Sequence, residues 1–477
     1  MKRLLLSFQF LLISLTGLFA QGYRIEVTID GLKDTEIYLA IHSGDKKYAV
    51  DTAMLDHKGY AVFRQKKELV AGMYLLVSGG GYLFDFLISD DKNQHFSIYT
   101  KVPDYISNLQ FKKSPENEAF VEFQHYLRNQ QKRVSELVER AKQDTNFKVA
   151  PDDIEVINNE VKEYIQQKIK QHKGLLLATI LKAAFPAMAP KPDIPEDTPK
   201  RDSLIWSYYY QFDKTHYFDC IDFSDARILL TPLLHPRIEE YFNRRLIQIP
   251  DSIIPQVDMV LRMAEANPNV YSSVLSQLFN KYVNAEIMGM ESLAVHIGEK
   301  YVLTGKATWL DSAAVEKVKD YVAYNRHSLI GMQAQELKVQ SLTGPFESLY
   351  AINSPYLMLV FYEPGCGHCK EEMPKLYEIF QKYRNQGVQA MAFYTIYKYN
   401  EWLKYVTENG FNDWINVWDG FNREDGLSIG SRFREYYNVL TTPQVFLLDK
   451  DKKIIGRRLN SDVLEQMLER EMSRNRQ

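Results

Sequence analysis

The N-terminal part of the chain shows the two-residue hydrophobic period of β-strands. Ile25, Val27 and Ile29 alternate with charged or hydroxyl-bearing residues, and Gly31 interrupts the run. Alternate residues of a strand face opposite sides, so this pattern predicts a strand with one buried face. Similar short runs, separated by turn residues, follow at 60–63, 73–77, 82–88 and 96–99. Strands at this spacing predict a small β-sandwich over residues 22–110.

At Ser114 the hydrophobic period changes to that of helices. Ser114 is a good N-cap, Pro115 suits the first helical position, and Glu116 favours the positive end of the helix dipole. Helical patterns then follow at 114–142, 152–172, 174–185, 203–217, 236–247, 251–266, 268–288, 291–303 and 311–326. Five prolines within 186–199 exclude regular structure there. We therefore predict an all-helical middle domain over 114–327 with a proline-rich break.

After about residue 328, strand patterns alternate with helical ones. The apolar run Tyr356–Tyr362 predicts a buried strand, Pro364 and Gly365 form a turn, and a helix begins at Cys366. Further strands are predicted at 388–396, 415–418, 444–448 and 453–459, and further helices at 401–409, 431–437 and 461–473. This alternation is typical of an α/β domain, which we place at 328–477.

Composition and charge narrow the classes of function. The chain has 477 residues, of which 45% are hydrophobic and 25% charged, which is ordinary for a globular protein of several domains. The formal net charge is −3. Nucleic-acid binding is not expected, because it calls for a strongly basic surface.

The N-terminus has the pattern of a secretory signal. Lys2 and Arg3 precede an apolar stretch from Leu4 to Ala20, which ends on a small residue. This stretch has 17 residues, four of them polar, so an uncleaved membrane anchor is the weaker alternative. We therefore predict a signal peptide at residues 1–20 and export to the periplasm or cell envelope.

Three cysteines are present, Cys220, Cys366 and Cys369. An exported protein held together by disulfides would carry more of them. A bridge between Cys366 and Cys369 closes a very small loop and would stabilise little. Cys220 lies among aromatic residues, which favours a buried, inert thiol. The Cys366–Cys369 pair is therefore better explained by a chemical role than by a contribution to stability.

The predicted position of Cys366, where a buried strand ends and a helix begins, favours a reactive thiol. Unpaired backbone N–H groups and the helix dipole stabilise an anion there, and the thiolate is the nucleophile. Cys369 lies on the same helical face and can resolve a mixed disulfide formed at Cys366. His368 can place a donor or a positive charge near the thiolate. The sequence therefore predicts a redox-active Cys366-Gly367-His368-Cys369 site.

Other uses of a cysteine pair fit less well. Zinc requires four ligands, and neither a second cysteine pair nor a histidine at ligand spacing follows. Covalent haem attachment requires a histidine directly after the second cysteine, where Lys370 stands. We therefore expect neither a metal nor a cofactor.

Residues 328–477 resemble the thioredoxin superfamily, and in particular its exported branch similar to cytochrome-biogenesis reductases. The matching features are the strand that ends in Phe361 and Tyr362, the Cys-Gly-His-Cys site, Lys370 to Pro374, Tyr437 to Pro443, and Phe446 to Asp449. The resemblance implies that Pro443, which follows Thr442, is cis and faces the two cysteines. It also implies that Glu372 assists proton transfer. The alternative is that Glu372 is an ordinary solvated charge on the helix surface.

Two positions depart from the pattern of thioredoxins. Thioredoxins carry a buried Asp six residues before the first cysteine, where this chain has Val360, and a Trp directly before it, where this chain has Gly365. The Gly-His dipeptide is that of protein disulfide isomerase, whose couple, at about −180 mV, is more oxidising than that of thioredoxin at about −270 mV. The superfamily branch implies a reductase, whereas the Gly-His dipeptide implies an isomerase or oxidant. The direction of disulfide exchange therefore stays open.

The whole chain resembles exported Bacteroidetes proteins in which uncharacterised β and helical domains precede a thioredoxin domain. The leading expectation is a thiol–disulfide oxidoreductase with Cys366 attacking and Cys369 resolving. Its implied partners are exported cysteine-containing proteins and a membrane or periplasmic electron donor. The alternatives are a partner-binding envelope protein with an accessory thioredoxin domain, and a peroxiredoxin-like peroxidase. The latter would need Thr or Ser at position 363, where Glu363 stands.

Overall fold

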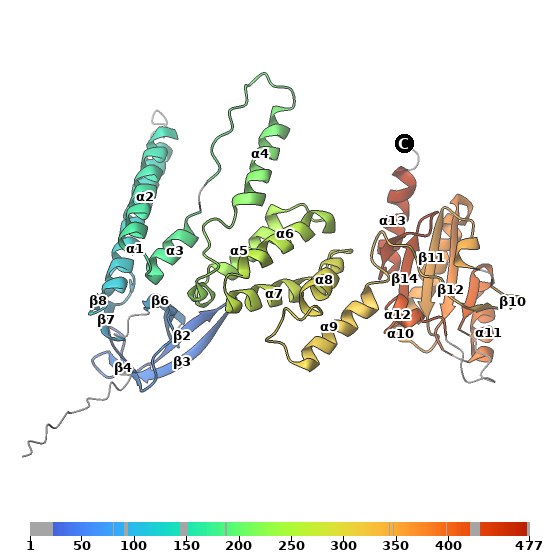
Figure 1. The fold of residues 1–477 in the computed structure, drawn as a ribbon, viewed down its shortest axis with the longest axis horizontal. Helices are drawn as coiled ribbons and strands as arrows, with labels where there is room; N and C mark the ends of the chain where they lie inside the picture. Colours follow the sequence, from blue (N-terminus) through green and yellow to red (C-terminus); the bar gives the residue numbers. More distant parts are fainter. Residues whose placement is uncertain are drawn as a thin grey trace, which may run out of the picture. The chain divides into compact units, whose positions relative to one another are not determined.

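The computed structural model describes residues 22–79, 81–89, 94–143, 151–186, 188–342, 344–346, 348–396, 398–419 and 430–474 (Figure 1). The predicted signal peptide at 1–20 lies outside the described residues. The chain forms two compact units, one of residues 1–246 and 262–271 and the other of residues 247–261 and 272–477. None of the helices that the structure describes is long and apolar enough to cross a membrane.

Two four-stranded sheets begin the first unit. The strands are β1 (Tyr23–Asp30), β2 (Glu36–Ser43), β3 (Lys46–Met54), β4 (Tyr60–Gln65), β5 (Gly72–Ser78), β6 (Gly81–Ile88), β7 (His95–Lys101) and β8 (Gln110–Lys112). Their orders are β4-β1-β7-β8 and β3-β2-β5-β6. Ile25 and Val27 of one sheet and Leu39 and Phe84 of the other belong to the same buried cluster. The two sheets therefore share a core, with the alternation in β1 directing its apolar residues inward.

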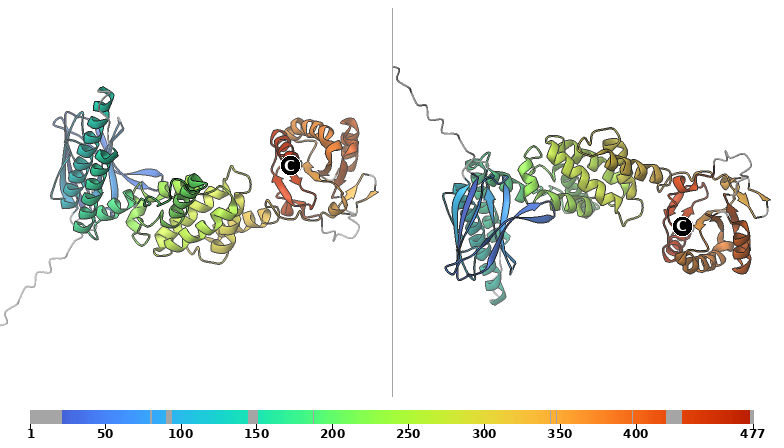
Figure 2. Two further views of the ribbon diagram at one scale, coloured as in Figure 1. Left: turned by 90° about the horizontal axis from the view of Figure 1, so that it is seen from above. Right: turned by 90° about the horizontal axis from the view of Figure 1, so that it is seen from below.

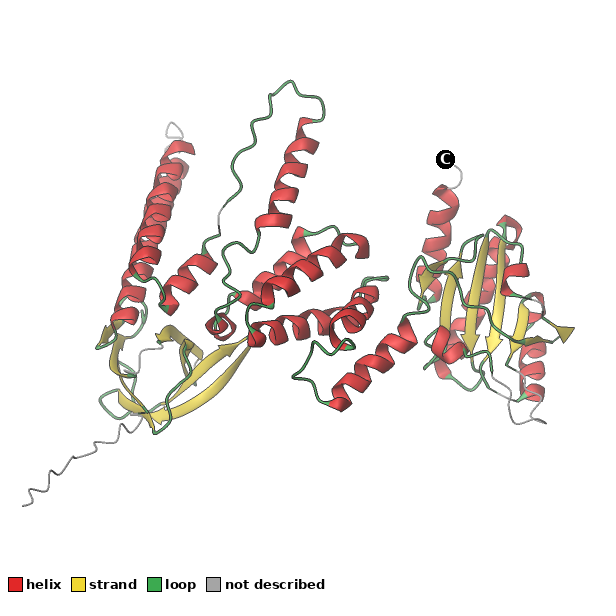
Figure 3. Ribbon diagram, in the orientation of Figure 1, coloured by secondary structure: helices red, strands yellow, loops and turns green. Residues whose placement is uncertain are grey.

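Helices make up the next part of the chain, drawn red in Figure 3. They are α1 (Pro115–Gln143), α2 (Pro151–Gln171), α3 (Leu176–Ala184), α4 (Arg201–His216), α5 (Leu234–Glu240), α6 (Pro250–Ala264), α7 (Pro268–Val283), α8 (Glu291–Ile297) and α9 (Ser312–Asn325). The helices α5 and α8 each continue into a π-helical turn, at Tyr241–Arg245 and Gly298–Val302. Residues 188–198, in the proline-rich break, contain no helix or strand.

A seven-stranded sheet forms the centre of the C-terminal part of the second unit. Its order is β10-β9-β13-β12-β11-β14-β15. The strands are β9 (Gln340–Ser341), β10 (Gly344–Pro345), β11 (Tyr356–Tyr362), β12 (Val388–Tyr394), β13 (Ile415–Trp418), β14 (Gln444–Leu448) and β15 (Ile454–Arg457). The central strand β11 pairs in parallel with β12 and antiparallel with β14.

Both faces of this sheet are covered, as Figure 2 shows for the C-terminal part of the chain. Helices α10 (Gly367–Tyr383), α11 (Tyr399–Glu408) and α13 (Ser461–Arg474) share a core with Met358 and Val360 of β11. Leu357 and Leu359 point to the other face, where α12 (Phe433–Tyr436) and residues of 334–349 pack. All seven residues of β11 are buried, because both of its faces are covered.

A buried ionic cluster joins the helical segment of the second unit to this sheet. Arg457 Nη1, at the end of β15, lies 3.1 Å from Glu291 Oε1 on α8, and the two side chains are 1% and 10% exposed. The side-chain oxygen Oδ1 of Asn325, at the end of α9, accepts hydrogen bonds from Arg457, Arg458 and Asn438 at 3.0, 3.2 and 3.0 Å. Helices α8 and α9 are thus fixed to the sheet by polar contacts within one unit.

Candidate active site

Cys366 stands between the buried strand β11 and helix α10. It is the N-cap residue of α10, with the extended backbone angles φ −76° and ψ 129°. Its own N–H donates to the Glu363 carbonyl at 3.1 Å and its carbonyl accepts from Lys370 N–H at 3.2 Å, so the turn is fixed on both sides. The thiol therefore lies beside the unpaired N–H groups of the first helical turn, where a negative charge is favoured.

The loop that contains Pro443 contacts the Cys366 thiol. Cys366 Sγ donates to the Thr442 carbonyl oxygen at 3.1 Å, across 76 positions of sequence. The Thr442–Pro443 peptide bond is cis, as the resemblance implies. The structure therefore brings Cys366, Thr442 and Pro443 together at one end of the sheet.

The pKa of the Cys366 thiol is lowered from its ordinary value. Burial of this half-buried side chain raises the pKa, but hydrogen bonds to the thiolate outweigh that effect. The donors are the backbone N–H and thiol of Cys369, the Thr442 side chain and the His368 backbone N–H. Cys366 is thus the better suited of the two thiols to act as the nucleophile.

Cys369 has the opposite environment. Its side chain is fully buried, at 0% exposed, in the core between the sheet and α10. Burial, with a further contribution from Cys366, raises the pKa of its thiol to about 11. The pair thus consists of an accessible thiol that ionises readily and a buried thiol that stays protonated.

Alkylation of the reduced, full-length protein is expected to separate the two thiols by pH. Iodoacetamide reacts with thiolates, so Cys366 should be modified first, at a rate that falls as pH decreases through its lowered pKa. Cys369 should react only as pH approaches about 11. Mass spectrometry of the digested protein measures both rates. Faster modification of Cys369 than of Cys366 at neutral pH would contradict this assignment.

His368 and Glu372 are placed differently from the thiols. His368 is exposed on the first turn of α10, and its backbone N–H lowers the pKa of the Cys366 thiol by hydrogen bonding. The Glu372 carboxylate accepts from the backbone N–H of Ser461 at 2.8 Å and from Lys375 Nζ at 3.0 Å. Glu372 therefore caps the first turn of α13 from the neighbouring helix α10.

The Glu372→Gln variant is expected to lower the free energy of unfolding by about 1 kcal/mol, since it removes a charged acceptor from the α13 N-terminus. The pKa of Glu372 is lowered, because the bonds to Ser461 and Lys375 outweigh burial. The contribution is therefore complete above the ordinary pKa of 4.5 and is lost as pH falls through the lower folded value. Urea unfolding at several pH values measures it, with the exposed neighbour Glu371→Gln as control. Equal effects of the two variants at pH 7 would show that the cap contributes nothing.

The surroundings of Cys369 include Val360 and Tyr362, which the sequence analysis named, and Trp402 and Tyr405, which it did not. Val360, where thioredoxins have a buried acid, is fully buried in β11. Burial raises the pKa of Tyr362 and of Tyr405, and the thiolate form of Cys369 would raise both further. The Tyr362 hydroxyl accepts from Trp402 Nε1 at 3.1 Å, 40 positions away. No local pattern links Trp402 and Tyr405 to the cysteine pair, so only the folded chain identifies them as neighbours of the buried thiol.

Comparison with known proteins agrees with this geometry. No protein-family profile matches the chain. Curated relatives include the thiol–disulfide oxidoreductase ResA of Bacillus thuringiensis and of Bacillus anthracis, each 26% identical over 138 residues, which is 29% of this chain and 74% of the relative. A solved domain of a possible thiol–disulfide isomerase from Cytophaga hutchinsonii is 34% identical, with a TM-score of 0.28. The match covers 32% of this chain and all of that domain. A solved thioredoxin-like protein from Bacteroides caccae is 20% identical, with a TM-score of 0.41. The match covers 59% of this chain and 98% of that protein.

Over its C-terminal part, the chain is a thioredoxin-like thiol–disulfide oxidoreductase. The ResA proteins of Bacillus are among the curated relatives of this part of the chain.

Proposed function

We propose that this protein is exported and exchanges disulfides with cysteine-containing proteins of the cell envelope through Cys366 and Cys369. The observation that supports this most directly is the contrast between the two thiols. Cys366 is accessible and its pKa is lowered, whereas Cys369 is buried and its pKa is raised to about 11.

In the reducing direction, the Cys366 thiolate attacks a substrate disulfide. A mixed disulfide forms and one substrate sulfur leaves as a thiolate. Cys369 then loses its proton and attacks Cys366 Sγ, which releases the second substrate thiolate and forms the Cys366–Cys369 disulfide. An electron donor of the membrane or periplasm reduces this disulfide. Pro443 and Thr442 position the substrate sulfur beside Cys366, and His368 favours its thiolate.

The Cys369→Ala variant is expected to accumulate mixed disulfides between Cys366 and its protein substrates. The attacking thiol remains, but the thiol that would release the substrate is gone. Affinity purification of the full-length variant from cell envelopes, under non-reducing conditions, recovers these adducts for mass spectrometry. The Cys366→Ala/Cys369→Ala double variant is the matched control. Equal recovery from both would argue against protein substrates.

The direction of exchange follows from the reduction potential of the pair. Equilibration of the full chain with glutathione buffers, followed by thiol trapping, measures it. A value near about −270 mV assigns a reductase, whereas about −180 mV or above assigns an isomerase or oxidant.

The Glu372→Gln variant also tests the proton-transfer role that the resemblance assigns to Glu372. A changed pH dependence of Cys369 alkylation supports that role. An unchanged dependence, together with the expected loss of stability, restricts Glu372 to capping α13.

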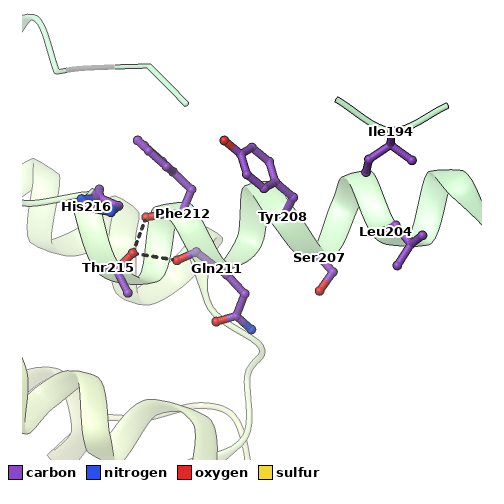
Figure 4. Close-up of a pocket in the computed structure, with 8 residues that line it drawn as sticks. All are labelled: Ile194, Leu204, Ser207, Tyr208, Gln211, Phe212, Thr215 and His216. Carbon is purple, nitrogen blue, oxygen red and sulfur yellow. Dashed lines mark hydrogen bonds between the residues drawn. The ribbon is translucent and has the colours of Figure 1, made fainter. Parts of the chain in front are cut away.

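A second function, capture of a partner protein by residues 22–327, is favoured by helix α4. None of its described side chains is buried, and Leu204, Trp206 and Tyr209 are 46%, 58% and 39% exposed. Tyr208 and Phe212, with Ile194 of the proline-rich segment, line a recess of about 620 Å³ along it (Figure 4). Exposed aromatic groups of this kind are typical of interaction sites. If deletion of 22–327 abolishes function while Cys366→Ala leaves it intact, partner binding is the principal function.

A further inference from the structure

Glu363 lies at the thiol site, but its side chain has no part in the proposed exchange. The Glu363 carbonyl accepts from Cys366 N–H at 3.1 Å. Burial raises the pKa of the Cys369 thiol, and a hydrogen bond from the Glu363 N–H to the Cys369 sulfur opposes that effect. The backbone of Glu363 is therefore fixed against both cysteines, and its side chain begins beside the turn that leads to the reactive thiol.

The carboxylate of Glu363 has no cation beside it within the part of the chain that the structure describes. It takes part in no hydrogen bond or ion pair there, although the side chain is half-buried. Burial of Tyr394 raises the pKa of its hydroxyl, and the charges of Glu401 and Glu363 add to that effect. A carboxylate also disfavours a nearby thiolate, so its place at a thiol site calls for a cation.

Gly365, two residues further on, is a glycine that the backbone does not require. Pro364 and Gly365 form the centre of the turn that the Cys366 N–H closes. Proline followed by glycine suits a turn whose third residue has positive φ. Gly365 has no positive φ, whereas Gly387 of the same sheet domain has a φ of 93°. A residue with a side chain could therefore adopt the same backbone at position 365.

Packing does not require a glycine there either. A Cβ atom at position 365 would meet Glu363 Oε1 at 3.6 Å, which is an ordinary contact. At Gly456, by contrast, a Cβ atom would meet Leu459 at 2.9 Å, so a neighbour would have to move. Gly365 is exposed to solvent. The absent side chain thus leaves open space next to Cys366, and the carboxylate of Glu363 borders that space.

The border of this space indicates what it can receive. In the exchange step the Cys366 thiolate bonds to one substrate sulfur while the other sulfur leaves with the electron pair. The residues next to the attacked cysteine of the substrate therefore come close to Cys366. A carboxylate attracts a cation there and repels an anion. Arginine fits best, because its planar guanidinium can donate two hydrogen bonds to one carboxylate.

We propose that Glu363 and Gly365 select substrates that carry a cationic residue, arginine above all, next to the cysteine that is attacked. Gly365 leaves room for that side chain, and Glu363 binds its charge. The inference rests on the proposed exchange with proteins and names the chemistry of the substrate that Cys366 prefers.

Three peptide disulfides of the same backbone test the proposal. They are the symmetrical disulfides of acetyl-Cys-Arg-amide, acetyl-Cys-Gln-amide and acetyl-Cys-Glu-amide. The reduced, full-length protein is mixed with each probe at pH 7. Acid quenching, alkylation and mass spectrometry then measure the rate at which the Cys366–Cys369 disulfide forms. Each rate is divided by the rate at which dithiothreitol reduces the same probe, which corrects for intrinsic reactivity.

The corrected rate should be about tenfold higher for the arginine probe than for the glutamate probe, with the glutamine probe between them. Glu363→Gln should reduce this preference to about twofold or less, because it removes the charge and keeps the shape. Gly365→Ile, which fills the space and keeps the charge, should reduce it as well. Glu371→Gln is the matched control, since it removes an exposed carboxylate of α10, and it should keep the preference.

Equal corrected rates for the three probes, or a preference that survives Glu363→Gln, would overturn the proposal. A preference that survives Gly365→Ile would also overturn it, because the cation would then lie outside the open space. If the unchanged protein reacted with none of the probes, the proposed disulfide exchange would itself fail. That result differs from exchange without selection, which counts against the roles of Glu363 and Gly365 alone.

Discussion

Replacing Cys366 by serine is expected to slow the reaction of the reduced protein with glutathione disulfide by about a thousandfold or more. A serine hydroxyl does not ionise near neutral pH, whereas the Cys366 thiol has a lowered pKa and lies beside the N–H groups that begin α10. The neighbouring thiol cannot replace it, since Cys369 is fully buried and its pKa is about 11. Stopped-flow measurement of thiol loss, with full-length protein at pH 7, gives the rates.

The matched control for this experiment is Cys220→Ser. Cys220 is 7% exposed, and burial raises the pKa of its thiol. It should therefore contribute nothing to exchange, and its variant should react at the rate of the unchanged protein. If Cys366→Ser kept more than about a tenth of the rate, another thiol would have to be the nucleophile.

The second large effect concerns stability. Arg457→Met is expected to lower the free energy of unfolding by about 3–5 kcal/mol, because it leaves the Glu291 carboxylate buried without its cation. Arg457 Nη1 and Glu291 Oε1 are 3.1 Å apart, although they are not aligned as a hydrogen bond, and burial lowers the pKa of Arg457 to about 10. The same change removes the bond from Arg457 to Asn325. Urea unfolding of the full chain, followed by tryptophan fluorescence, measures the loss.

The Arg457→Met/Glu291→Leu double variant separates the two contributions. It removes both charges and keeps apolar volume in their place, so it should be more stable than Arg457→Met alone. An ion pair on the surface serves as the comparison for the loss of stability. Lys382→Met, which breaks an exposed ion pair with Glu465, should change stability much less than Arg457→Met does. If Arg457→Met cost no more than Lys382→Met, the buried cluster would not hold α8 and α9 against the sheet.

Much of the secondary structure follows from local sequence alone. The alternation in residues 23–30, the apolar run at 356–362 and the start of a helix at Cys366 depend on neighbours within one or two turns. The observed strands β1 and β11 and helix α10, which begins at Gly367, lie close to these predictions. The same reasoning predicts that Cys366 and Cys369 are the reactive pair, because a helix N-terminus stabilises a thiolate whatever the rest of the fold. One helix expected at 236–247 begins at Leu234 and continues from Glu240 as a π-helical turn, a detail of tertiary packing.

The tertiary structure decided which distant residues meet. Cys366 forms a hydrogen bond with Thr442, 76 positions away, and Glu372 forms one with Ser461, 89 positions away. No hydrophobic period in the sequence predicts such pairs. For that reason sequence analysis left Glu372 between a proton-transfer role and a solvated charge, whereas its observed bonds cap α13. The contrast between the two thiols was likewise only half determined by the sequence. Helix geometry predicts that Cys366 ionises readily, but the raised pKa of Cys369 depends on burial by the sheet and its covering helices, which exist only once the chain has folded.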